Sequence, residues 1–352
     1  AGAAKYVDPL NGSDANDGSI AAPWKTLVNI HNLADTVYIS NSAVCYFGPS
    51  HDRNPIDVTL MPWGDERPTI VISNNGGTAA IYLSRNPGPG RVVMRNLKLA
   101  PAAATTFIIS RFAGAKTIDV ENCEFDMSNG GASTRRFHLR TQNLYFRFWS
   151  NLVYKADTSS GYFINSEEVP YICDVRYNRF YDFSGANPAI MYAASAGVAG
   201  IVANNTAWGC NYMMFYNNTG DMILTNVNNI VEYAKITSGK PWFRSASSTA
   251  RSFADYIYSG DTAPITFDAN TVQGPSNFTA LSEAQIKFYN TNDVTDPHFL
   301  KIDIGSVAWN SGAAETYPEL GLPTYAGWAA VPEPAAFLFA GVCVVLGALR
   351  KR

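Results

Sequence analysis

Arg95-Asn-Leu-Lys-Leu99 is the first of five similar segments that decide the fold. The others are Glu121-Asn-Cys-Glu-Phe125, Ser150-Asn-Leu-Val-Tyr154, Tyr177-Asn-Arg-Phe-Tyr181 and Asn204-Asn-Thr-Ala-Trp208. Their asparagines are 26, 29, 27 and 27 residues apart, and Asn228-Asn-Ile-Val231 continues the series. A repeat of this period, without helical periodicity between its copies, predicts a β-solenoid with one coil per repeat.

The residues after each asparagine alternate in polarity, as in a β-strand. The first and third are mainly apolar, as in Leu97 and Leu99, whereas the second is charged in Lys98 and Glu124. Successive side chains of a strand point to opposite sides, so we expect the first and third positions to face the core. Arg179 is a first-position residue that this pattern does not explain.

The repeated asparagines are predicted to hold the coils together. Asparagine tolerates the left-handed backbone of a sharp bend. Stacked coils lie about 4.8 Å apart, so an amide in one coil can bond to the amide in the next and avoid being buried without a partner. We therefore expect a structural ladder rather than a ligand site, formed by Asn96, Asn122, Asn151, Asn178 and Asn205.

The N-terminal stretch is Tyr6-Val-Asp-Pro-Leu-Asn-Gly-Ser-Asp-Ala-Asn-Asp-Gly18, followed by Ala22-Pro-Trp-Lys-Thr-Leu27. It resembles the opening of right-handed parallel β-helices of the pectate-lyase-like superfamily, and Asp296-Pro-His-Phe-Leu-Lys-Ile-Asp303 resembles their final coil. The resemblance covers most of residues 5–325. It implies an all-β, right-handed parallel β-helix whose first strand, loop and short helix cap the open end and protect its edge.

The C-terminal residues have three parts: Val331-Pro-Glu-Pro334, an uncharged apolar run over 335–349, and three basic residues. A helix over this run would be about 22 Å long, which is short for a membrane span, and a buried helix is the alternative. The order of parts resembles the PEP-CTERM sorting signal of Gram-negative bacteria, with Pro332, Glu333 and Pro334 as its motif. That resemblance implies export, passage through the inner membrane and recognition by an exosortase.

Four regions follow from these patterns. We expect an N-terminal cap over 1–30, a β-helix body over 31–311, a Gly/Pro/Ala linker over 312–330 and a sorting tail over 331–352 that ends in a short hydrophobic helix. The Ala1-Gly-Ala-Ala start is what remains after removal of a secretory leader, which again predicts export. Whether the tail is retained is left open.

The composition excludes some partners. Without the tail the chain has 23 basic and 28 acidic residues, a net charge of −5, which argues against nucleic acid. The five cysteines and four histidines match no zinc pattern, and free buried cysteines are favoured over disulfides. We expect no cofactor, with Ca²⁺ bound by Asp8, Asp14 and Asp17 as the alternative. Turns stabilised by these aspartates explain the same loop.

One charged column could carry chemistry. Asp126, Lys155 and Asp182 each stand four residues after a repeated asparagine, so coils in register would stack them as acid, base and acid. A lyase needs such a base and a glycosidase needs two carboxylates. Two flanking carboxylates would keep the lysine protonated, so a surface ion-pair row is favoured and no catalytic residue is assigned.

Two functions remain. The first is an exported, non-catalytic β-helix protein of the cell surface or extracellular matrix that associates with itself in filaments or layers. The tail, the low charge and the lack of a clear acid–base set favour it. The alternative, implied by the superfamily alone, is a secreted polysaccharide lyase, glycosidase or glycan-binding protein, and fold does not determine function.

Overall fold

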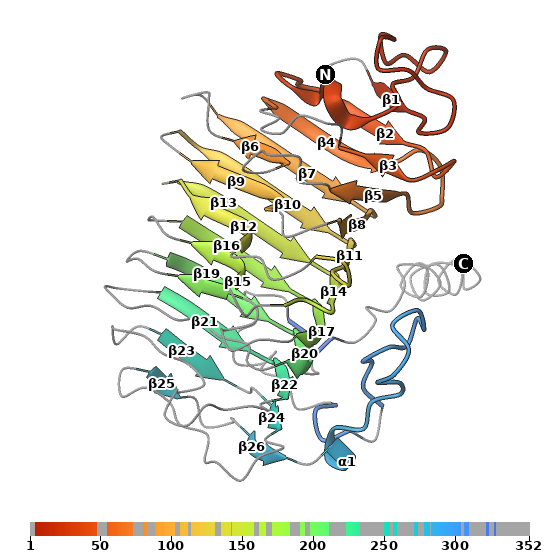
Figure 1. Ribbon diagram of the computed structural model, residues 1–352. Helices are drawn as coiled ribbons and strands as arrows, with labels where there is room; N and C mark the ends of the chain where they lie inside the picture. The colour runs from red at the N-terminus through yellow and green to blue at the C-terminus, as the bar shows by residue number, and fades with distance from the viewer. Residues whose placement is uncertain are drawn as a thin grey trace, which may run out of the picture.

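The protein is a parallel β-solenoid, seen from the side in the computed structural model of Figure 1. The all-β fold with about 27 residues per coil, predicted from the repeat, is confirmed. The structure describes residues 4–47, 55–72, 80–83, 89–102, 106–111, 114–130, 135–141, 143–157, 162–166, 171–183, 191–193, 198–210, 223–232, 250–253, 256–258, 271–273, 278–281, 283–303, 306–309, 322–323 and 327–328.

Within the described residues, three parallel sheets of 11, ten and five strands form its walls. Sheet 1 has 11 strands: β1 (Lys5–Val7), β2 (Thr36–Ile39), β4 (Asp57–Pro62), β7 (Gly90–Arg95), β10 (Lys116–Glu121), β13 (Leu144–Trp149), β16 (Tyr171–Arg176), β19 (Val198–Ala203), β21 (Ile223–Val227), β23 (Ala250–Phe253) and β25 (Thr271–Gln273). Sheet 2 has ten: β3 (Cys45–Tyr46), β5 (Thr69–Ile72), β8 (Lys98–Pro101), β11 (Glu124–Asp126), β14 (Leu152–Tyr154), β17 (Arg179–Phe183), β20 (Thr206–Cys210), β22 (Ile230–Glu232), β24 (Tyr256–Tyr258) and β26 (Phe278–Leu281). Sheet 3 has five: β6 (Ile81–Leu83), β9 (Ile108–Arg111), β12 (Arg135–Arg140), β15 (Tyr162–Ser166) and β18 (Met191–Ala193).

A left-handed residue makes the bend from sheet 1 to sheet 2 in successive coils. Its φ is between 51° and 58° at Asn96, Asn122, Ser150, Tyr177, Asn204 and Asn228. Strand pairing agrees, because Glu124 lies opposite Lys98 on one side and Leu152 on the other. The sequence alignment was therefore one residue out: Asn96 and Asn122 occupy the bend, whereas Asn151, Asn178 and Asn205 follow it.

The asparagines that follow the bend make a buried ladder. The Nδ2 of Asn151 donates to Oδ1 of Asn178 at 3.1 Å, Asn178 donates to Asn205 at 2.9 Å, and Asn205 donates to Asn229 at 2.9 Å. Each Nδ2 also donates to a backbone carbonyl of the coil before its own, as Asn178 does to Phe148 at 2.7 Å. These bonds satisfy amide groups that would otherwise be buried without partners.

The one-residue shift reverses the predicted inward and outward faces in the later coils. Val153, Phe180 and Ala207 were expected to point outward, but all three are fully buried in the core. They continue the column of Leu99 and Phe125, which the sequence placed correctly. A shift of one residue moves every side chain of a strand to the other face, so the error propagated through three coils.

A stack of phenylalanine rings fills the middle of the solenoid. Phe125 contacts the rings of Phe107, Phe137, Phe148 and Phe163 at centroid distances of 5.6 to 5.9 Å. These rings come from all three sheets or the turns between them, so the core ties the three walls together. Four free cysteines, Cys45, Cys123, Cys173 and Cys210, are also buried among the described residues.

The N-terminal segment closes one end of the stack, at the top of Figure 1. β1 pairs with β2, and the 3-10 helix η1 (Leu27–Ile30) buries Leu27 and Ile30 in the core. The Thr26 hydroxyl caps this helix by accepting from the Val28 N–H.

A C-terminal strap covers the outer face of sheet 2. It runs over 283–303 and 306–309, begins with helix α1 (Glu283–Ile286), and buries Phe299, Leu300 and Ile302 against Leu152, Tyr154, Trp208 and Ile230. The segment 296–303 was expected to be a final coil, but it pairs with no strand of the three sheets and packs outside them. Hydrophobic residues thus occupy both faces of the later strands, which hid the true alternation.

The strap also explains Arg179. Its guanidinium donates to the carbonyl of Phe299 at 3.2 Å and lies 4.0 Å from the centroid of the Trp328 ring, so the side chain points outward and is then covered. Burial lowers the pKa of Arg179 to about 10.

The rest of the C-terminal region is largely outside the described residues. Only 322–323 and 327–328 of the expected linker are described, and the predicted sorting tail, with the helix expected over 335–349, lies outside them. Within the described ranges, no helix has the length and apolar character needed to cross a membrane.

The Asn178→Ala variant should unfold more easily than the wild type. It removes two bonds that Asn178 accepts from Asn151 and leaves the carbonyl of Phe148 without this donor. We expect a loss of about 2–4 kcal/mol in the free energy of unfolding, measured by urea denaturation. The exposed Asn41→Ala variant is the matched control and should change stability by less than about 0.5 kcal/mol. Equal losses of stability in the two variants would contradict a stabilising role of the asparagine ladder.

Candidate functional site: the outer face of sheet 1

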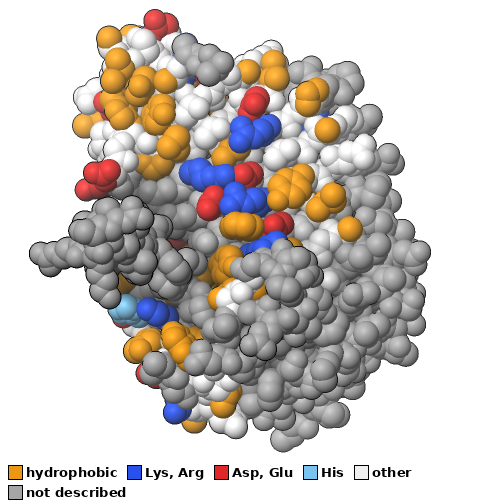
Figure 2. Space-filling view, turned by 180° about the vertical axis from the view of Figure 1, so that it is seen from behind, with side chains coloured by type: hydrophobic (Ala, Val, Ile, Leu, Met, Phe, Trp, Pro, Cys, Tyr) orange, Lys and Arg blue, Asp and Glu red, His pale blue; other side chains and the backbone are white. Residues whose placement is uncertain are grey.

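Charged side chains form two adjacent columns on the outer face of sheet 1. Strand register aligns Asp119, Arg147 and Asp174 in column one, and Arg95, Glu121, Trp149 and Arg176 in column two. Figure 2 shows this face, where basic and acidic side chains alternate in a band with hydrophobic side chains beside it. We call these seven residues the charged band.

Ion pairs between neighbouring coils join the band. Arg95 contacts Asp119 at 2.5 Å and Glu121 at 3.2 Å, and Arg147 contacts the same two carboxylates at 3.0 and 3.1 Å. Burial lowers the pKa of Arg95, but its bond to Asp119 and the charges of both carboxylates outweigh this and raise the pKa. The band therefore has three arginines and three carboxylates, with Asp174 paired to Arg176 at 2.6 Å.

Trp149 lies within this network. The guanidinium of Arg147 is 3.9 Å from the centroid of its ring and that of Arg176 is 5.2 Å away. Guanidinium groups are attracted to the face of an indole ring. Trp149 therefore links two ion-paired arginines, Arg147 and Arg176, within the charged band.

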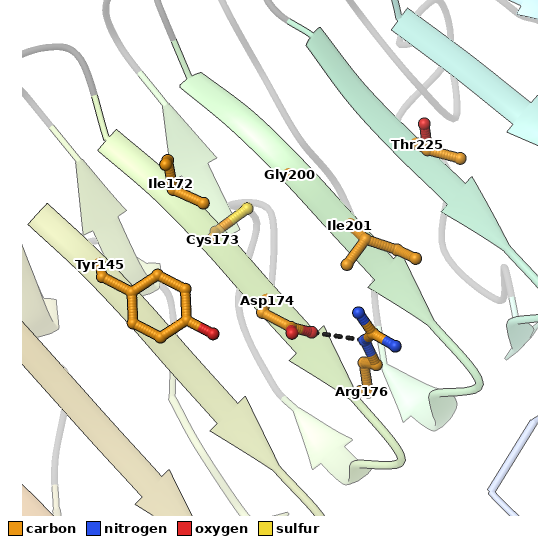
Figure 3. A pocket seen from close by; sticks show the side chains of 8 residues that line it. All are labelled: Tyr145, Ile172, Cys173, Asp174, Arg176, Gly200, Ile201 and Thr225. Carbon is orange, nitrogen blue, oxygen red and sulfur yellow. Dashed lines mark hydrogen bonds and ion pairs between the residues drawn. The ribbon is translucent and has the colours of Figure 1, made fainter. Parts of the chain in front are cut away.

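A hollow of about 310 Å³ opens beside the lower part of the band. Figure 3 shows Tyr145 and Ile172 on one side of it, with Asp174 and its partner Arg176 on the other. Cys173, Gly200, Ile201 and Thr225 complete the lining. Tyr145 and Ile172 are 39% and 55% exposed, so a ligand in the hollow would meet both apolar surface and charged hydrogen-bonding groups.

Gly200 is required at the floor of the hollow. Its φ is +141°, and a Cβ at this position would overlap the carbonyl oxygen of Cys173. Only glycine adopts this backbone readily, and its missing side chain leaves the strand accessible. Burial and the charge of Asp174 raise the pKa of Tyr145, so its hydroxyl stays a neutral hydrogen-bonding group.

The structure does not bring the three residues considered as catalytic candidates into one column. Lys155 and Asp182 are stacked at left-handed positions of adjacent coils, with φ of 57° and 53°. Asp126 instead pairs with Tyr154, one residue earlier, so the expected acid–base–acid column does not form. Neither aspartate has an ion pair with Lys155 among the described residues.

Asp126 belongs to a second cluster, on the outer face of sheet 2. Lys98 contacts Glu124 at 2.8 Å and Asp126 at 3.4 Å, and the Tyr154 hydroxyl donates to Glu124 at 2.8 Å. Burial raises the pKa of Glu124, but the bonds from Lys98 and Tyr154 outweigh it and lower the pKa. Burial likewise lowers the pKa of Lys98, and these carboxylates outweigh it and raise the pKa.

The aspartates considered for Ca²⁺ are used within the N-terminal loop. Asp14 accepts from the backbone of Lys25 and Thr26, and Asp8 accepts from Leu10, Asn11 and Ser42. Asp17 accepts from Ser19. Across the described residues, no group of three His, Cys, Asp or Glu side chains could hold a metal ion.

Sequence reasoning missed the hollow and most of the charged band. The signal is at the end of the strand before each bend, where outward polar or aromatic residues alternate with a buried apolar one in Asp119-Val-Glu121, Arg147-Phe-Trp149 and Asp174-Val-Arg176. Aligned with each other, these strands predict the two columns. Attention to the asparagine and the residues after it left them out.

Three solved structures are similar to this protein in fold. No family model and no curated protein matches the sequence. The structure is similar to "Rhamnogalacturonan lyase" (10% identity, TM-score 0.45, 92% of this chain and 100% of that chain) and to pectate lyase Pel9A (13%, 0.42, 93% and 94%). It is also similar to GH136 lacto-N-biosidase from Eubacterium ramulus (13%, 0.34, 79% and 68%).

The Glu124→Gln variant should show a pH-dependent loss of stability. The pKa of Glu124 is below its ordinary value of 4.5 in the folded protein, so its charge stabilises the fold fully above about pH 4.5 and this contribution is lost as the pH falls through the folded pKa. At pH 7 we expect the variant to be about 1–2 kcal/mol less stable than the wild type. Urea denaturation at several pH values should show the gap closing below pH 4.5. A gap that stays constant down to pH 3 would contradict the assignment.

Proposed function

We propose that the protein is a glycan-binding β-helix that holds a polysaccharide on the outer face of sheet 1. The observation that carries the proposal is the hollow, with the exposed ring of Tyr145 on one side and the Asp174–Arg176 pair on the other. Sugar rings have apolar C–H faces and a rim of hydroxyl groups. An aromatic ring with carboxylate and guanidinium groups nearby matches both parts.

The balance of charge favours a sugar over a polyanion as the ligand of this face. The arginines of the charged band are all paired with carboxylates, so the band offers directed hydrogen bonds without an excess of positive charge. Pairing also holds the side chains in place before the ligand arrives, which reduces the entropy lost on binding.

Catalysis is less well supported than binding, because both carboxylate pairs on the outer faces are held by cations. Arg147 bridges Asp119 and Glu121, and Lys98 bridges Glu124 and Asp126. A glycosidase needs one carboxyl group of its pair to be protonated, and the lowered pKa values of Glu124 and Asp126 oppose this.

Lyase activity is the alternative reading. A lyase needs a basic group that can take a proton, but Arg176, the base that lines the hollow, is ion-paired. The structural role predicted first, as a self-associating surface protein, has its main support in the sorting tail, which is outside the described residues. Export to the surface of a Gram-negative cell and recognition by an exosortase stay predictions.

Binding can be tested by calorimetric titration of the purified protein with acidic and neutral polysaccharides. We expect at least one polysaccharide to bind, and Tyr145→Ala to weaken it about tenfold, equivalent to about 1.4 kcal/mol of lost ring stacking. The matched control is Tyr46→Ala on sheet 2, because Tyr46 is 51% exposed and lies on another face.

Two results would oppose the proposal. Equal loss of polysaccharide affinity in Tyr145→Ala and Tyr46→Ala would exclude the hollow as the binding site. Release of unsaturated sugar products by the wild type, lost in Lys155→Ala, would instead establish a lyase with its centre on sheet 2.

A further inference from the structure

A second group of exposed rings lies on the outer face of sheet 1, near its N-terminal end. The rings of Tyr6 and Tyr38 stack with centroids 5.4 Å apart, and the ring of Trp63 meets Tyr6 edge-on at 5.0 Å. All three side chains are partly exposed. We call these residues the aromatic platform.

The aromatic platform is not needed to complete the core at this end. The inward side chains of the same strands, Val7, Val37 and Ile39, are fully buried without it. The rings lie on the opposite side of the strands, as the alternation of a strand requires. Three adjacent aromatic side chains on an outer face are typical of a surface that contacts a ligand.

Strand register places the platform in line with the charged band. Tyr6 pairs with Tyr38 and Tyr38 with Met61, while the neighbouring Leu60 pairs with Met94. Met61, the residue after Leu60, is therefore in register with Arg95, the first residue of column two. The sheet order counts three steps from β4, which Trp63 follows, to β13 of Tyr145, and six steps from β1 to β16, which are roughly 14 and 29 Å at about 4.8 Å per step.

The two ends of this line offer the same chemistry. The hollow presents Tyr145 beside a charged pair, and the platform presents three rings on or directly after the strands that precede β7, the strand of Arg95. A single sugar unit cannot reach from one end to the other. A chain of sugar units can, because each unit repeats the same pattern of apolar faces and hydroxyl rims.

We propose that the ligand is a linear polysaccharide lying along the stack of coils, with one part in the hollow and a distant part stacked on Tyr6, Tyr38 and Trp63. The inference rests on the proposed glycan binding and adds the direction and the minimum length of the ligand. Affinity should rise with chain length until the oligosaccharide spans both ends, because the second contact is then intramolecular.

The test uses the full chain and a length series of oligosaccharides cut from the polysaccharide that the wild type binds. Affinity for each length is measured by calorimetry for the wild type, Trp63→Ala and Tyr145→Ala. We expect Trp63→Ala to leave the affinity for short oligosaccharides unchanged and to lower the affinity for long oligosaccharides about tenfold. Tyr145→Ala should weaken binding at every length. Trp63→Phe keeps an aromatic ring and should restore most of the increase in affinity with oligosaccharide length. This variant, together with thermal unfolding of each variant, controls for loss of folding.

The outcomes separate this inference from the proposed function. If short and long oligosaccharides bind the wild type equally, or if Trp63→Ala keeps the full gain with length, the platform is not part of the site although glycan binding stands. If no oligosaccharide or polysaccharide binds at all, both proposals fail.

Discussion

Hydrogen bonding between equivalent residues of successive coils is the constraint on which the rest of the structure depends. Each strand pairs in parallel with its copies in the neighbouring coils, so a residue type at one position recurs as a column. Directly after the bend the column is a buried asparagine ladder, in which Asn151, Asn178 and Asn205 each bond to the next amide. A buried amide without its neighbour would lose bonds that water cannot replace, so the ladder holds the coils in one register.

The same register decides what the outside of the solenoid can do. On sheet 1 it brings Asp119 of one coil between Arg95 and Arg147 of its neighbours, and the carboxylate is held from both sides. On sheet 2 it aligns Tyr154, Tyr181 and Trp208 in an aromatic column, which the C-terminal strap covers. One sheet therefore offers an open polar surface, whereas much of the other is sealed.

The hollow depends on details smaller than the repeat. It opens where Gly200 takes a backbone conformation that other residues rarely adopt, beside the exposed Tyr145 and Ile172. These residues come from three consecutive strands of sheet 1. An isolated glycine in a strand signals a close backbone approach, but its neighbours across the sheet are known only once the register is known.

The repeat of the coil could be predicted from the sequence, whereas the faces of the later strands could not. The coil length and the all-β class could be predicted, because five copies of a short motif recur at a nearly constant spacing. The faces of the later strands could not, because Asn122 and Asn151 are chemically alike but occupy different positions of the coil. The spacing of 29 residues between them was the sign of that shift. The hydrophobic contacts of Leu152 and Tyr154 with the strap then imitated a core-facing pattern.

The sequence by itself thus determined the solenoid, since repetition and alternation are local properties of the chain. It did not determine the surface, because a face is built from residues that lie 26 to 28 positions apart and meet only in exact register, as Arg95, Glu121 and Trp149 do. A slip of one residue in a strand exchanges its inside and outside. Tertiary structure alone settles that choice, through the buried ladder, the ring stack and the strap that covers one sheet and leaves the other open.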